Sequence, residues 1–113
     1  MRLIPARVLP DDPLDASAEF LSRVVPEVRA AIGAADLAAC IVFDPADHRH
    51  RGWRLAAIQS LGREAAPGRV NAVAVAVAEE ATLRSAVTYL ETAPGVTGQY
   101  LPLDGHGAGD ALG

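Results

Sequence analysis

One short segment carries the residue types that could do chemistry. Asp44, Asp47, His48 and His50 fall within seven positions of the chain, and a carboxylate with two imidazoles is a ligand set that zinc accepts. The same side chains could instead be the polar groups of a small-molecule site. A His-X-His pair without a spaced partner is a weak metal signal, however, and a carboxylate just before a helix commonly caps its first turn. The sequence therefore favours a solvated capping loop, and no metal is expected.

The other nucleophile and acid–base candidates carry weaker signals. Ser17, Ser60 and Ser85 fall inside helical patterns without the glycine elbow that exposes a catalytic serine. Cys40 is the sole cysteine and lies in an apolar run, which is typical of a core residue in a reducing compartment. His106 lies in a glycine-rich segment that is expected to fray. None of these residues predicts an active site.

Composition bounds the class of protein. The 113 residues allow one domain with a modest core, and 50% hydrophobic with 21% charged residues is typical of a globular chain. The formal net charge is -4 without a sizeable basic cluster, so nucleic acid is not an expected partner. The longest apolar run, residues 72–78, is far shorter than the roughly 20 residues of a membrane span. Pro5 and Arg7 interrupt the start before a signal-peptide core forms, which favours a cytoplasmic location.

The apolar pattern divides the chain into alternating helices and strands. Helical spacing runs from Asp12 to Gly33, with Asp12 placed to cap the helix and Pro26 expected to bend it or restart its last turns. Continuous apolar runs bounded by turn residues are typical of strands buried on both faces of a parallel sheet. The expected elements are helices over 12–33, 53–65 and 79–93 and strands over 37–43, 70–77 and 99–103, with 3–9 as a candidate first strand. This order predicts an α/β fold: a three-layer, partial Rossmann-like arrangement in which helices flank a small parallel sheet of three to four strands.

Three stretches then resemble the C-terminal half of the short-chain dehydrogenase/reductase (SDR) family. Residues 62–74 are similar to the family's helix that ends in an acidic residue and Ala-Pro, followed by a strand reading Arg-Val-Asn-Ala-Val. Residues 95–105 are similar to its closing Thr-Gly-Gln strand with an Asp-Gly end, and residues 20–28 resemble its long dimer helix. The resemblance implies three segments: an N-terminal strand or arm (1–11), an SDR-like half-domain (12–105) and a flexible glycine-rich tail (106–113).

The resemblance also implies that the catalytic parts of the family are replaced. An ungapped count from Glu64 and Pro67 places Asp47 at the position of the catalytic tyrosine and Arg51 at that of the lysine four residues later. A carboxylate is ionised at neutral pH and cannot donate the proton that a carbonyl reduction requires. Asp15 falls where the dimer helix carries an active-site asparagine. We therefore expect these three positions to be degenerate and the chain to contain no catalytic residue.

A dinucleotide site is not expected either. Such a site needs a glycine-rich turn that lets backbone amides approach the pyrophosphate, and the resemblance begins near the family's fourth strand, after that turn. The isolated chain is therefore expected to bind no cofactor, and NADP or NAD would enter only with a partner subunit.

The matched segments are those that the resembled family uses to associate. The sequence thus predicts a non-catalytic SDR-like subunit that forms a homo-oligomer or a hetero-oligomer with an intact SDR reductase, which it stabilises or regulates. Two alternatives stay open: a small enzyme or ligand-binding protein that uses the family's cofactor cleft with Asp47, His48 and His50, and a product without activity of its own. The interface candidates are apolar or aromatic side chains: Phe20, Leu21, Val24, Val28, Leu55, Leu61, Leu90, Tyr100 and Leu101.

Overall fold

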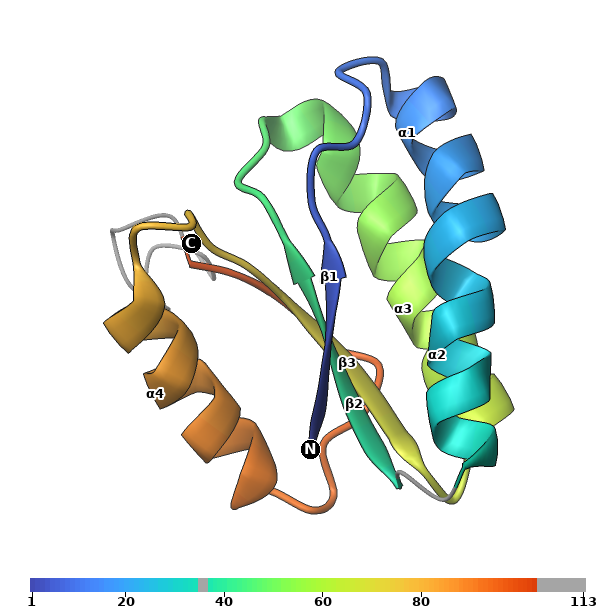
Figure 1. Ribbon diagram of the computed structural model, residues 1–113, viewed down its shortest axis with the longest axis vertical. Helices are drawn as coiled ribbons and strands as arrows, with labels where there is room; N and C mark the ends of the chain where they lie inside the picture. Colours follow the sequence, from blue (N-terminus) through green and yellow to red (C-terminus); the bar gives the residue numbers. More distant parts are fainter. Residues whose placement is uncertain (35–36, 104–113) are drawn as a thin grey trace.

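The computed structural model describes residues 1–34 and 37–103, so the expected tail at 106–113 lies outside the described residues. Four parallel strands form one sheet in the order β1-β2-β3-β4 (Figure 1). This arrangement confirms the expected parallel α/β sheet, including its candidate first strand. The strands are β1 (Arg2–Ala6), β2 (Ala38–Phe43), β3 (Arg69–Ala74) and β4 (Tyr100–Pro102).

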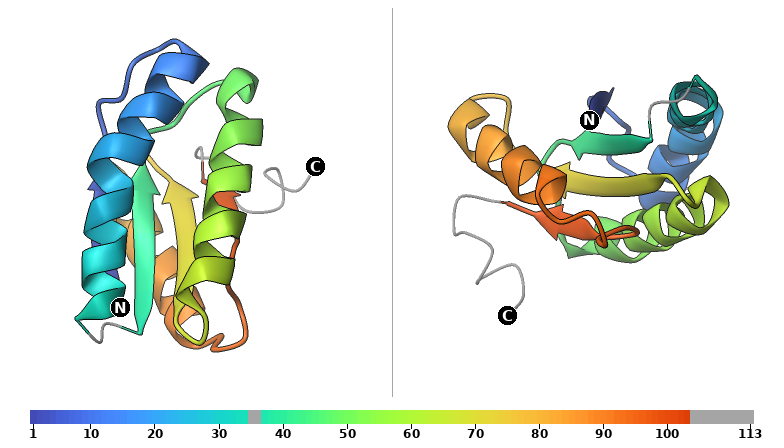
Figure 2. Two further views of the ribbon diagram at one scale, coloured as in Figure 1. Left: turned by 90° about the vertical axis from the view of Figure 1, so that its right-hand side faces the viewer. Right: turned by 90° about the horizontal axis from the view of Figure 1, so that it is seen from below.

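Helices cover both faces of the sheet and make three layers (Figure 2). One face is covered by a continuous helical segment and by a second helix, and the opposite face by a single helix (Figure 1). The continuous segment consists of α1 (Pro13–Glu19), the π-helical turn η1 (Phe20–Val24) and α2 (Val25–Gly33). The second helix on that face is α3 (Arg51–Ala65), preceded by the 3-10 turn η2 (His48–His50), and the helix on the opposite face is α4 (Glu80–Glu91).

Pro26 explains the irregular middle of the first helical segment. Its ring nitrogen has no hydrogen, so it cannot donate to the carbonyl of Ser22 four residues earlier. The π-helical turn ends just before Val25, and α2 starts there with Pro26 in its first turn, where a missing donor costs little. The expected restart is confirmed. So is the cap, because the Asp12 side chain accepts a hydrogen bond from the Asp15 amide at 3.0 Å.

Alternate residues of the strands point to opposite faces and build two cores. Under α1–α3, Phe43 of β2 stacks on Phe20 with ring centroids 5.4 Å apart, and Trp53 packs edge-on against both rings. Under α4, Cys40 of the same strand and Leu90 of α4 are fully buried in a second cluster. One strand therefore supplies both cores, and Cys40 is the core residue that its apolar surroundings predicted.

The carboxyl ends of the strands lie level at one edge of the sheet. The register pairs Ala6 with Phe43, Phe43 with Ala74, and Ala74 with Pro102. In parallel α/β sheets, ligands bind at the carboxyl edge. The loops that follow β1 and β2 meet there.

Three apolar side chains within the expected elements are exposed. Leu14 and Leu21 share the helical spacing of the first helix but are 80% and 60% exposed, because the sheet covers a narrower arc of the helix than the apolar residues occupy. Leu21 therefore keeps the surface that an interface candidate requires. The strand expected to reach Val77 ends at Ala74. Val75 still donates to the carbonyl of Phe43 at 3.0 Å, after which a turn leaves Val77 exposed.

Candidate functional site

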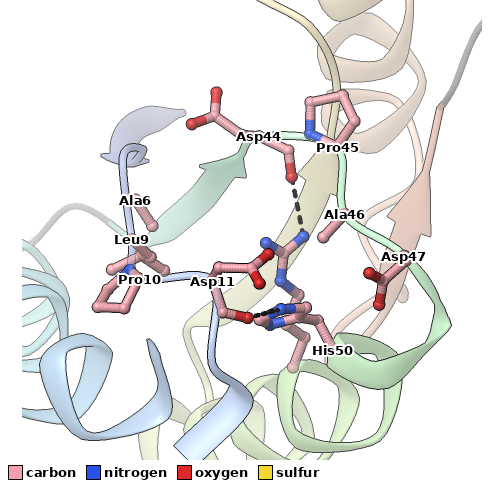
Figure 3. Close-up of a pocket in the computed structure, with 10 residues that line it drawn as sticks. Ala6, Leu9, Pro10, Asp11, Asp44, Pro45, Ala46, Asp47 and His50 are labelled. Atoms are coloured by element: carbon pink, nitrogen blue, oxygen red, sulfur yellow. Dashed lines mark hydrogen bonds between the residues drawn. The ribbon is translucent and has the colours of Figure 1, made fainter. Parts of the chain in front are cut away.

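A cavity of about 170 Å³ opens at the carboxyl ends of β1 and β2 (Figure 3). The loop after β1, the loop after β2 and the start of α3 form its walls. It therefore occupies the edge of the sheet at which this class of fold binds ligands. Its apolar lining consists of Ala6, Leu9, Pro10, Pro45 and Ala46, and its polar lining of Asp11, Asp44, Asp47, His50 and Arg54.

Asp44 joins the two loops. Its carboxylate accepts hydrogen bonds from Arg7 at 2.6 Å and from the Val8 amide at 2.8 Å, and Arg7 also donates to the carbonyl of Val75 at 2.7 Å. Partial burial alone would raise the pKa of Asp44, but the Val8 amide, Arg7 and the nearby charge of Arg54 together lower it. Asp44 is therefore ionised and links the loop after β2 to the loop after β1. Val8 adopts a positive φ of 59°, a strained conformation for a β-branched residue, and its bond to Asp44 helps to hold it there.

Asp47 caps the turn that leads into α3. Its carboxylate accepts hydrogen bonds from the Arg49 amide and from the Arg49 side chain, both at 3.0 Å. These bonds lower the pKa of Asp47 to about 2. Arg49 also reaches the carboxylate of Asp11 at 3.3 Å. The capping role that the sequence favoured is confirmed, and the carboxylate holds no proton at neutral pH.

His50 is buried and both of its ring nitrogens are engaged. Nε2 lies 2.9 Å from the carbonyl of Asp11, and Nδ1 accepts a hydrogen bond from the Trp53 indole at 3.0 Å. This network assigns the proton of a neutral ring to Nε2. His48 is exposed and does not line the cavity. Among the described residues, no group of three or more His, Cys, Asp or Glu side chains is arranged to hold a metal.

Arg54 is the site residue that the sequence analysis missed. Its side chain is buried, with the residue only 4% exposed, and one terminal nitrogen donates to the carbonyl of Asp44 at 2.9 Å and to the Tyr100 hydroxyl at 3.1 Å. Its guanidinium lies 4.3 Å from the centre of the Phe43 ring, and its Nε has no hydrogen-bond partner in the part of the chain that the structure describes. Position 54 is four residues before the buried Ile58 on α3. That spacing was the signal that could have placed Arg54 on the inner face of the helix.

The three positions that the resemblance aligns with the family's active site do not gather in this cavity. Asp47 lines it, whereas Arg51 and Asp15 are exposed and lie outside its lining. The side chains brought together there are therefore a different set from the one that the resemblance implied.

A second concave surface lies between the helices on the α1–α3 side. Two adjoining hollows of about 270 and 220 Å³ share Arg29, Leu61 and Glu64 in their walls. We call this surface the helix-pair groove. Arg29 and Glu64 form a bidentate ion pair across it, with bonds of 2.9 and 2.8 Å. Its remaining lining is mostly apolar: Leu21, Val25, Val28, Ile32, Gly33, Ala56, Ala57, Ser60 and Ala65.

The predicted interface candidates divide into two groups. Four of them are at most 1% exposed, pack inside the chain's own core and offer almost no surface to another chain: Phe20, Val24, Val28 and Leu90. The others keep surface or line the groove: Leu21, Leu55, Leu61, Tyr100 and Leu101. Any contact through the predicted set would therefore use the second group.

The fold and the cavity at the strand ends define a small, parallel, Rossmann-like α/β protein. A family model described as short chain dehydrogenase-like protein matches residues 4–103. This match spans most of the chain, which therefore belongs to the SDR-like family. Neither a comparison with curated proteins nor one with solved structures found a match. Among the described residues, no helix combines the length and apolar character that crossing a membrane requires.

Proposed function

We propose that this chain is a non-catalytic SDR-like subunit that associates through the helix-pair groove. The observation that carries the proposal is the groove itself, which presents apolar side chains at the surface of the helices that the resembled family uses for subunit contact. Leu21, at its wall, is 60% exposed. Covering this surface would remove apolar area from water, which favours association by about 25 cal/mol per Å² before the costs of binding.

The groove suits a second copy of the same chain. A two-fold contact places one surface patch against itself, so the patch must be self-complementary. Arg29 and Glu64 bring both signs of charge to the groove, beside a mostly apolar lining. A copy turned by 180° would therefore meet opposite charges and apolar surface. An intact reductase of the same family is the alternative partner, because it would offer the corresponding pair of helices.

The site at the strand ends supports the non-catalytic part of the proposal. By the ungapped count, Asp47 falls at the position of the family's proton-donating tyrosine. Arg49 keeps it ionised through hydrogen bonds that lower its pKa. An ionised carboxylate is a poor general acid near neutral pH. We accordingly propose that any NADP- or NAD-dependent reduction belongs to a partner subunit.

Native mass spectrometry of the purified chain tests the association. We expect a homodimer, and we expect Leu21→Glu to shift it to monomer because a charge would then have to be buried in the contact. Val77→Glu is the matched control: it makes the same kind of change at an aliphatic residue that is 74% exposed and lies away from the groove. A wild-type chain that is monomeric at micromolar concentration, both alone and when co-expressed with an intact SDR reductase, would contradict the proposal. A mixed complex would select the alternative partner.

A further inference from the structure

Among the residues that the structure describes, the buried charge of Arg54 has no carboxylate as a hydrogen-bond partner. Its two hydrogen bonds go to neutral oxygens, the carbonyl of Asp44 and the hydroxyl of Tyr100, and its Nε donates to none of the described residues. Buried charges in proteins are normally paired, because leaving water is costly for an ion. Arg54 is 4% exposed and lines the cavity, so its charge is a candidate for binding an anion there.

The neighbouring carboxylates are committed to other cations. Asp44 forms its ion pair with Arg7, at 2.6 Å, and Asp47 forms its own with Arg49, at 3.0 Å. Asp44 senses the charge of Arg54 through space, but the hydrogen bond between them uses its backbone carbonyl. Within residues 1–34 and 37–103, Arg54 thus has no anionic hydrogen-bond partner.

The cavity also limits the shape and charge of a ligand. Its volume of about 170 Å³ suits a molecule of a few heavy atoms, and Leu9, Pro10, Pro45 and Ala46 give it apolar walls. Asp47, also in the lining, would repel a doubly charged phosphate more strongly than a singly charged group. A flat carboxylate matches the fork of a guanidinium, and a short aliphatic chain matches the walls.

We propose that this cavity binds a small aliphatic monocarboxylate, with its carboxylate held by Arg54 and its carbon chain against Leu9, Pro10 and Ala46. The binding site is separate from the helix-pair groove and does not depend on the association proposed above. Arg54 and the apolar walls also separate it from the alternative built on Asp47, His48 and His50, because the ligand carries the same negative charge as Asp47 and is held by Arg54 instead.

The experiment is a titration of the purified chain with sodium butyrate, followed by the fluorescence of Trp53, the sole tryptophan. Trp53 packs against Phe43, on which Arg54 lies, so its emission should respond to a ligand in the cavity. We expect a saturable change with butyrate and a raised melting temperature. Butyramide, which has the same shape without the charge, should bind at least about tenfold more weakly, because it cannot form charge-assisted hydrogen bonds with the guanidinium. Inorganic phosphate should also bind at least about tenfold more weakly, because Asp47 repels its additional charge.

Variants locate the site. Arg54→Gln should abolish saturable binding, Arg54→Lys should weaken it about tenfold because the fork is lost, and Arg51→Gln, on the exposed side of the same helix, should leave it unchanged. Ala46→Leu alters the exposed wall and should also abolish binding, which keeps the test decisive if Arg54→Gln does not fold. The proposal is overturned if butyrate does not saturate, if butyramide or phosphate binds as well as butyrate, or if a folded Arg54→Gln or Ala46→Leu chain binds like the wild type.

Discussion

The two faces of the sheet are covered very differently. Of the residues that the structure describes, fifteen are buried in the core under α1–α3 and six in the core under α4. The first core holds stacked and edge-on rings of Phe20, Phe43 and Trp53, whereas α4 contributes a single fully buried residue, Leu90. Stability in a protein follows the density of such contacts. We therefore expect the α4 face to open at lower free energy than the α1–α3 face, which also supports the candidate cavity.

The largest effect should come from Phe43→Ala. This substitution removes a ring that contacts Phe20, Trp53 and Tyr100 and on which the Arg54 guanidinium lies. Large-to-small changes of buried phenylalanine cost about 3–5 kcal/mol in the free energy of unfolding. Urea denaturation followed by circular dichroism measures this loss of unfolding free energy. A loss smaller than that of an alanine substitution in the α4 core would contradict the expected difference in stability between the two faces.

A smaller effect is expected for Leu90→Ala, at about 2–3 kcal/mol, because one leucine is lost and α4 can shift inward to fill the space. Cys40, under the same helix, reports the opening of this face. Burial raises the pKa of its thiol to about 12, so it is unreactive in the closed state. The rate of labelling by a disulfide reagent at pH 8 should rise in Leu90→Ala while the fluorescence of Trp53 stays native. Labelling that proceeds only together with loss of the native fluorescence would show that the two faces open as one unit.

The smallest effect is expected from acid, through Asp44. Its folded-state pKa is lowered, so the folded chain binds fewer protons there than the unfolded chain does. The resulting stability is fully present above the unfolded pKa of about 4 and is lost as the pH falls through the folded value. Asp44→Asn should therefore be less stable than the wild type at pH 7, and the difference should shrink below about pH 4. The comparison is made by urea denaturation at each pH.

The acid experiment also bears on the two faces. Arg7 links Asp44 to the carbonyl of Val75, and so ties the β1 end to the centre of the sheet. Since the centre serves both faces, weakening this tie should affect Trp53 fluorescence and Cys40 labelling together. A change in only one of these two measurements would show that the Arg7–Asp44 contact stabilises one face of the sheet only. Asp47→Asn is the comparison variant: the pKa of Asp47 is also lowered, but that carboxylate is exposed and caps a turn away from Val75, so the contact between Arg7 and Val75 stays in place.

Much of the fold could be predicted because its signals are local. Apolar runs bounded by turn residues marked the strands, and Asp12 and Pro26 act on the nearest turns of the first helix. The strand end near Val77 was predicted wrongly. The apolar pattern continues there past the point where neighbouring elements stop covering the chain, and distant segments set the extent of that cover.

The candidate site was only half predictable for the same reason. The loop with Asp44, Asp47 and His50 was identified from residue types, and the structure places all three in the cavity lining. His48 belongs to the same sequence cluster but does not line the cavity. Arg54 was missed because its burial depends on contacts with Phe43 and Tyr100 from two strands of the sheet.

Local signals were enough to predict the alternation of helices and strands, the parallel sheet, the capping of the turns and the resemblance to the SDR family. Each of these rests on residues close together in the chain. Which apolar side chains are buried, and the place of Arg54 beneath the loops after β1 and β2, depend instead on packing between distant segments, because those segments contribute the surfaces that set burial, charge pairing and cavity shape. Arg54 meets Phe43, Asp44 and Tyr100 only once the sheet has formed.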